Sequence, residues 1–108
     1  MPGTFSIVTS QIVITEVLNY VSRGGERLRR LAARMVQELE NNSYVEIIPQ
    51  SDAQFRTAVE RYAARSNQRW SLTDCASFLA MEERGITQAL AYDRDFEQAG
   101  FTALLRER

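Results

Sequence analysis

The chain contains no histidine, and this absence excludes several common kinds of active site. Catalysis by Ser-His-Asp or Cys-His groups needs an imidazole as base, and His-based zinc sites need it as a ligand. Cysteine is nearly absent too, since Cys75 is alone and therefore forms no internal disulfide. A single cysteine fits a reducing cytoplasm. Because Cys75 falls on the apolar side of an expected helix, we interpret it as a small core residue.

Long apolar runs are also missing. No segment approaches the roughly 20 residues that a membrane-spanning helix needs. The first residues, Met1 to Phe5, lack the basic region and apolar core of a secretory signal. We therefore expect a cytoplasmic protein that does not associate with a membrane.

Lysine is the third absence, because all 13 basic residues are arginine. Arginine binds phosphate bidentately, but genome composition produces the same bias. The net charge of −1 argues against a strongly electrostatic nucleic-acid binder.

With 108 residues, 44% of them hydrophobic and 25% charged, the chain has the size and composition of one soluble domain.

Apolar patterns along the chain predict alternating strands and helices. Short apolar runs indicate strands at 6–8, 45–49, 89–92 and 101–105. Helical periodicity and capping residues indicate helices at 10–23, 26–41, 51–67 and 71–85. This alternation predicts a layered α/β domain with a mostly parallel sheet flanked by helices.

The periodicity also predicts which side chains the helices bury. For the second helix the predicted apolar face comprises Leu28, Leu31, Ala32, Met35, Val36 and Leu39. For the third helix it comprises Phe55, Ala58, Val59, Tyr62 and Ala63.

Two acidic residues stand where elements begin or end. Asp74 lies in the first turn of the helix that Ser71 caps, and Asp93 directly follows the apolar run 89–92, with Asp95 close behind. Carboxylates at such ends can converge on one cleft, where a divalent cation relieves their repulsion. Each acid taken alone also has a plain structural interpretation. Asp74 completes a capping pair with Ser71, the other two are turn residues, and Glu16 is a solvated helix charge.

In combination these segments resemble a known family. The run Ser71-Leu72-Thr73-Asp74-Cys75-Ala76-Ser77-Phe78 is similar to the helix-opening motif of PIN-domain nucleases. The run 93–96 followed by 99–101 is similar to the closing motif of that family, and 8–10 with 14–18 is similar to its glutamate segment. The resemblance covers nearly the whole chain in the correct order. It implies a three-layer PIN-like α/β domain.

The resemblance also implies a function and a set of site residues. It implies a ribonuclease that uses Mg²⁺ or Mn²⁺, and suggests the toxin of a toxin–antitoxin pair, with RNA as substrate and an antitoxin protein as partner. The implied metal ligands are Glu16, Asp74 and Asp93, with Asp95 as a helper. Implied residues around them are Ser10 and Thr73, which hydrogen-bond the carboxylates or metal waters, and Arg69 and Trp70, which contact RNA. For the last pair the alternative is a core tryptophan beside a surface arginine.

The front of the chain departs from the family pattern. A complete PIN domain begins with a strand that carries an aspartate, whereas no aspartate precedes Asp52 here. We therefore expect a domain shortened by its first strand and helix, and a homodimer that covers the gap. A truncated inactive domain and a shifted strand at 6–8 are the alternatives. The alternative function is an inactive PIN-like module that binds RNA or a protein, and a third is an α/β interaction domain without metal.

Overall fold

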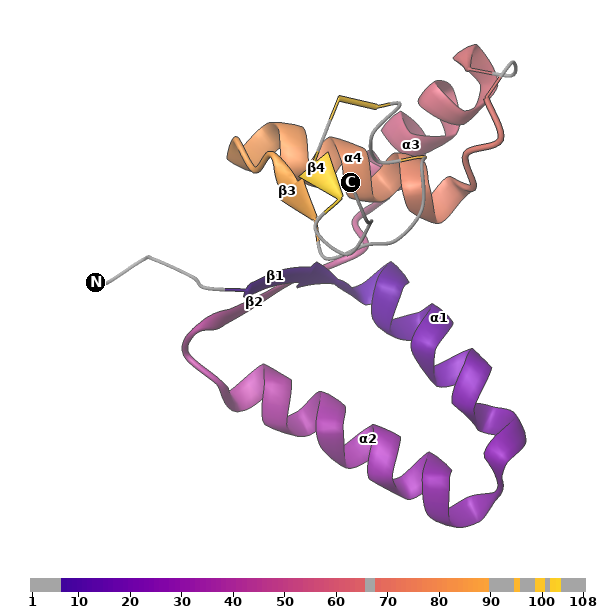
Figure 1. The fold of residues 1–108 in the computed structure, drawn as a ribbon, viewed down its shortest axis with the longest axis vertical. Helices are drawn as coiled ribbons and strands as arrows, with labels where there is room; N and C mark the ends of the chain where they lie inside the picture. The colour runs from indigo at the N-terminus through magenta and orange to yellow at the C-terminus, as the bar shows by residue number, and fades with distance from the viewer. Residues whose placement is uncertain (1–6, 66–67, 90–94, 96–98, 101, 104–108) are drawn as a thin grey trace. The chain divides into compact units, whose positions relative to one another are not determined.

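The computed structural model describes residues 7–65, 68–89, 95, 99–100 and 102–103 (Figure 1). The backbone divides into two compact units, Met1–Gln50 and Ser51–Arg108, and each is described by itself. Over the described residues, both units combine helices with one pair of short parallel strands, so the protein is α/β, mostly helical, with a small parallel sheet in each unit. Within the described ranges, no helix is long and apolar enough to cross a membrane.

In the first unit, two parallel strands are joined by a pair of helices. Its elements are, in order, β1 (Ile7–Ser10), α1 (Gln11–Val21), the short 3-10 helix η1 (Ser22–Gly24), α2 (Glu26–Asn41) and β2 (Val45–Ile48). The two strands pair in a register that places Ile7 opposite Val45 and Ser10 opposite Ile48. Parallel neighbours need a long crossover, and α1 with α2 supplies it.

The crossover turns at a glycine pair, where η1 ends and α2 begins (Figure 1). Gly25 has a φ of 91°, in the left-handed region that side chains with a Cβ rarely adopt. The long α2 helix therefore begins at a position that requires glycine.

The second unit contains two longer helices followed by a pair of very short parallel strands. Its described elements are α3 (Asp52–Ala64), α4 (Leu72–Arg84), β3 (Gln88–Ala89) and β4 (Thr102–Ala103). Serines cap both helices, since Ser51 Oγ accepts from the N–H of Gln54 at 3.1 Å and Ser71 Oγ from that of Asp74 at 3.0 Å. Gly85, with φ of 65°, ends α4 in the left-handed conformation.

The core of the second unit gathers around Phe78. Trp70, Cys75 and Ala58 are buried with it, and the rings of Trp70 and Phe78 meet edge to face at 5.0 Å between centroids. Edge-to-face aromatic pairs add stability beyond the area that they bury. Trp70 therefore anchors the start of α4 against α3.

An ion pair at the surface also joins α3 to α4. The two terminal guanidinium nitrogens of Arg61, Nη1 and Nη2, donate to the Glu82 carboxylate, at 2.8 and 2.9 Å. The hydrogen bonds from Arg61 lower the pKa of Glu82 below its ordinary value. Because the contact is bidentate, with two parallel hydrogen bonds, this pair is stronger than a surface ion pair with a single contact.

Most predicted elements are confirmed. The strand at 6–8 is present as β1 and that at 45–49 as β2, while the helix at 26–41 coincides with α2. The third helix ends at Ala64 rather than near Asn67. The strands predicted at 89–92 and 101–105 are described only at Gln88–Ala89 and Thr102–Ala103, and their other residues lie outside the described part.

The predicted burial of two helical faces is wrong. On α3 only Ala58 is buried, whereas Phe55, Val59 and Tyr62 are 40–54% exposed and Ala63 is exposed as well. Because the contact of α3 with α4 passes over the small Ala58, the larger neighbours on the same face stay at its rim. On α2 only Ala32 is buried, and the larger exposed side chains are those of Leu28, Leu31 and Met35.

Candidate functional site

Asp74 occupies the first turn of α4 and takes part in a reciprocal cap. Its backbone N–H donates to Ser71 Oγ, and its Oδ2 accepts from the Ser71 N–H, each at 3.0 Å. The capping interpretation is therefore confirmed. An ionised carboxylate has about four acceptor positions, so the cap holds Asp74 in place and is compatible with metal ligation.

The residues beside Asp74 differ in their surroundings. Cys75 is fully buried in the core, which confirms its interpretation as a core residue. Burial raises the pKa of its thiol, and the nearby Asp74 charge raises it further, so Cys75 stays protonated at neutral pH. Thr73 is half-buried in the first turn of the same helix.

Glu16 and Ser10 belong to the first unit. Glu16 is exposed on α1, while Ser10 caps that helix by accepting from the N–H of Val13 at 3.3 Å. Ser10 therefore already has a structural role at the junction of β1 and α1. Hydrogen bonding of Ser10 or Thr73 to the predicted ligands stays a prediction.

Of the two acids in the closing motif, the structure describes only one. Asp95 is half-buried, and its backbone carbonyl accepts from the N–H of Ala99 at 3.1 Å. Asp93 lies outside the described residues. In the part of the chain that the structure describes, no three His, Cys, Asp or Glu side chains are grouped to hold a metal ion. The convergence of Glu16, Asp74 and Asp93 therefore stays a prediction.

The chemistry of the predicted ligands fits the predicted metal. Glu16, Asp74, Asp93 and Asp95 offer oxygen donors alone, which is the donor type that Mg²⁺ and Mn²⁺ prefer. No histidine or thiolate is required of the chain, and its one thiol is buried in the core.

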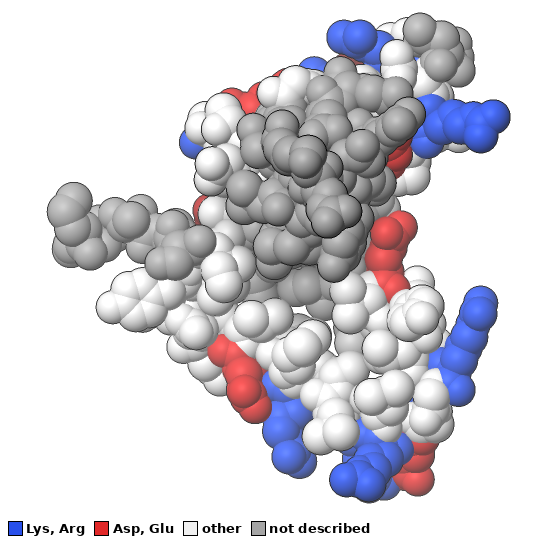
Figure 2. Space-filling model, in the orientation of Figure 1, with Lys and Arg blue, Asp and Glu red and all other residues white. Residues whose placement is uncertain are grey.

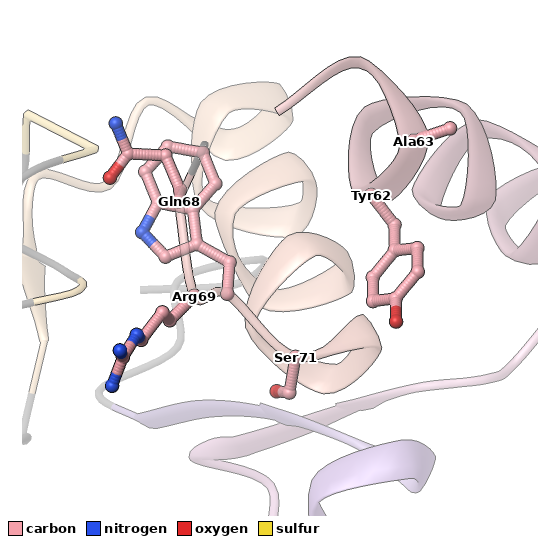
Figure 3. A pocket seen from close by; sticks show the side chains of 6 residues that line it. Tyr62, Ala63, Gln68, Arg69 and Ser71 are labelled. Carbon is pink, nitrogen blue, oxygen red and sulfur yellow. The ribbon is translucent and has the colours of Figure 1, made fainter. Parts of the chain in front are cut away.

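Arg69 and Trp70 border a pocket of about 470 Å³ between the end of α3 and the start of α4 (Figure 3). Its other lining residues are Tyr62, Ala63, Gln68 and Ser71. Arg69 is exposed, whereas Trp70 is 8% exposed and belongs to the core. The burial of Trp70 favours the core alternative for this residue, and the RNA contact of Arg69 stays a prediction.

Sequence reasoning missed two features around this tryptophan. The guanidinium carbon of Arg65 lies 5.9 Å from the centre of the Trp70 ring, a cation–π distance. Tyr62 lines the pocket with about half of its surface exposed, although its spacing predicted burial. The spacing assigns Tyr62 to the face of α3 that contacts α4. It does not show whether a residue on that face is buried at the centre of the contact or exposed at its edge.

A profile of the PIN domain matches residues 3–102. The chain belongs to the PIN-domain family. The match covers both units and includes all the predicted site residues. This confirms the family resemblance that the motifs indicated.

A solved structure of a PIN toxin has the same fold. The chain is similar to VapC20 of Mycobacterium tuberculosis, a toxin that cleaves the sarcin–ricin loop, with 27% sequence identity and a TM-score of 0.78. The similarity covers 96% of this chain and 76% of that one. A comparison with curated proteins finds no match.

Proposed function

We propose that this PIN domain is a metal-dependent ribonuclease that acts as the toxin of a toxin–antitoxin pair. The observation that carries the proposal is the PIN profile over residues 3–102, together with the structural likeness to a toxin that cleaves RNA. The motifs add support, because the acidic residues occur in family order along the chain.

In this proposal Glu16, Asp74 and Asp93 hold Mg²⁺ or Mn²⁺ through carboxylate oxygens, with Asp95 as a helper. Asp74 is held for this role by the cap, since its Oδ2 accepts from the Ser71 N–H. The N-terminus of α4 also favours a negative charge at this position. Thr73 and Ser10 steady the carboxylates or the water ligands through their hydroxyl groups.

The bound ion would activate a water molecule toward the scissile phosphate and stabilise the departing oxygen. The carboxylates set the position of the ion and leave room for a phosphate oxygen. Arg69, which is exposed just before α4, contacts the RNA backbone near the cleaved bond. Such a reaction needs no histidine.

The substrate we propose is a structured RNA, with the sarcin–ricin loop as the first candidate because VapC20 cleaves it. The partner is an antitoxin that covers the acidic cleft with a basic or apolar segment. Both proteins would act in the cytoplasm, where the RNA is.

We further propose that two copies associate. A second copy would cover apolar side chains that one copy leaves exposed. Large apolar side chains that are 40% or more exposed occur in both units, which is consistent with such packing. A sedimentation experiment that shows a stable monomer at micromolar concentration would contradict the dimer.

The second candidate function is a PIN-like module that binds RNA or a protein without cutting. Such a module needs no complete set of metal ligands, and no aspartate stands before Asp52 in the sequence. Binding without cleavage distinguishes this candidate from the nuclease.

Metal binding is the first test. We expect Mn²⁺ to bind saturably in a calorimetric titration and Asp74→Asn to abolish this binding, because one charged ligand is lost. The asparagine oxygen still accepts from the Ser71 N–H, so the cap and the fold should persist. Asp52→Asn is the matched control, since Asp52 also begins a helix but pairs with Arg56. Equal Mn²⁺ affinity in wild type and Asp74→Asn would remove Asp74 from the site.

RNA cleavage is the second test. A sarcin–ricin stem–loop oligonucleotide should be cut with Mn²⁺ or Mg²⁺ present and left intact with chelator or with Asp74→Asn. An uncut oligonucleotide that still binds the protein would favour the non-cutting module.

A further inference from the structure

The arginines of this chain are unevenly distributed. Residues 23–34 contain five arginines and one glutamate, a net charge of +4, so the rest of the chain, with eight arginines and 13 acids, carries −5. The overall charge of −1 therefore conceals one strongly basic segment. In Figure 2 arginine side chains gather over α2, which follows the turn at η1.

Three of these arginines share one face of α2. Arg27, Arg30 and Arg34 follow the spacing of three and four residues that aligns side chains along a helix. The face extends about 10 Å, at about 1.5 Å of rise per residue. All three side chains are exposed, and the apolar residues Ala32, Val36 and Leu39 lie on a different side of the helix. We call these three residues the arginine face.

The charges of the arginine face are available to a partner. Among the described residues, Arg27 and Arg34 form no ion pair. Arg30 pairs with Glu26, but both side chains are about three-quarters exposed, at 73% and 77%. A surface pair of this kind contributes little and exchanges readily for a stronger anion. The arginine face therefore presents a positive charge that contacts within the described fold do not neutralise.

From this placement we infer that the arginine face binds the phosphate backbone of RNA. The inference rests on the proposed function and adds to it a surface for holding the substrate. A metal site of carboxylates repels RNA until the cation binds, so attraction must come from elsewhere on the protein. Arginine is suited to this role, since its planar guanidinium donates two parallel hydrogen bonds to a phosphate.

A lipid surface fits the arginine face less well. A basic helix that binds membranes inserts its apolar side between the lipids. Part of the apolar side of α2 is engaged in its own unit, where Ala32 is buried and Val36 and Leu39 are half-buried, whereas Leu28, Leu31 and Met35 are exposed. The proposed function supplies RNA as the anionic partner, and RNA is therefore the occupant that we favour.

The test measures RNA binding in the presence of a chelator, so that neither metal binding nor cleavage contributes. Fluorescence anisotropy would follow a labelled stem–loop RNA as the salt concentration changes, for wild type and for Arg27→Gln/Arg34→Gln. We expect the slope of log affinity against log salt to fall by about 1.4–1.8, since each phosphate contact contributes about 0.7–0.9. At about 0.1 M salt the loss of two contacts corresponds to roughly 25- to 60-fold weaker binding.

Two further variants isolate the arginine face. Arg56→Gln/Arg84→Gln removes the same charge from the second unit and should leave the slope nearly unchanged. Arg27→Lys/Arg34→Lys keeps the charge and should keep most of the slope. Thermal unfolding should be the same for Arg27→Gln/Arg34→Gln and wild type, because neither side chain forms an ion pair among the described residues.

The outcomes separate this inference from the proposed nuclease. If the wild type cleaves RNA but the salt slope is unchanged in Arg27→Gln/Arg34→Gln, only the RNA-binding role of the arginine face is overturned. If the wild type never cleaves RNA but binds it with the expected dependence on Arg27 and Arg34, only the proposed nuclease activity is overturned. Equally tight binding to phosphatidylserine vesicles, lost in the same double variant, would overturn the assignment to RNA.

Discussion

The two units bury their apolar side chains to different extents. In the second unit Trp70, Cys75 and Phe78 are buried together with Ala58 in one cluster. The described part of the first unit buries only Ala32 and Ile48, and several large apolar side chains of α1 and α2 stay 40% or more exposed. The aromatic core stabilises the second unit by itself, whereas the amphipathic helices of the first unit bury few of their apolar side chains.

The largest expected effect comes from removing the centre of the aromatic core. Phe78→Ala should cost about 3–5 kcal/mol of unfolding free energy, because it leaves a cavity beside the Trp70 ring. Leu31→Ala on α2 is the matched change in the first unit. It should cost about 1 kcal/mol, since the leucine is already 48% exposed. Urea unfolding followed by Trp70 fluorescence and by circular dichroism measures both, and equal costs would contradict the contrast between the units.

Removing a helix cap should also destabilise the second unit more than the first, although by a smaller amount than the core substitution. Ser71→Ala removes one half of the reciprocal cap and should cost about 1–1.5 kcal/mol. Ser10→Ala removes a single, longer hydrogen bond of 3.3 Å and should cost about 0.5 kcal/mol. Thermal unfolding of the two variants tests the order. A larger loss for Ser10→Ala would show that its hydroxyl does more than cap α1.

The smallest expected effect is a pH dependence from the ion pair that joins α3 to α4. The pKa of Glu82 is lowered in the folded chain, so the folded state favours the carboxylate. Its contribution is complete above the unfolded pKa of about 4.3 and disappears as the pH falls through the lower folded value. Glu82→Gln should therefore cost about 0.5–1 kcal/mol at neutral pH, and this cost should diminish as the pH falls below the unfolded pKa.

Glu26→Gln is the control for this pH dependence. It breaks the more exposed pair with Arg30 in the first unit and should cost about 0.2–0.5 kcal/mol. Unfolding at a series of pH values measures both variants. A constant cost for Glu82→Gln across the range would show that packing, and not charge, is responsible.

Local signals explain why so many elements could be predicted. The serines before α3 and α4 begin their helices through hydrogen bonds within three residues, which a sequence displays directly. Gly85 ends α4 for an equally local reason. The PIN motifs were recognisable because they combine such local signals in a fixed order, and the profile match confirms the family.

Burial could not be predicted in the same way. Periodicity placed Phe55, Val59 and Tyr62 on one face of α3, and they do share it, yet the contact with α4 passes over Ala58 instead. How far a face is covered depends on the size of the partner and on where the two helices cross. Neither quantity is contained in the spacing of residues along one helix.

The sequence by itself determined most helix boundaries, because capping residues act within a few positions. It also displayed the order of the acidic residues by which the family was recognised. Only the tertiary structure decided that Trp70 is a core residue and that Phe55, Val59 and Tyr62 stay exposed. The physical reason is that a side chain is buried only when residues distant in the sequence pack against it and exclude water. Those contacts form only when the chain has folded.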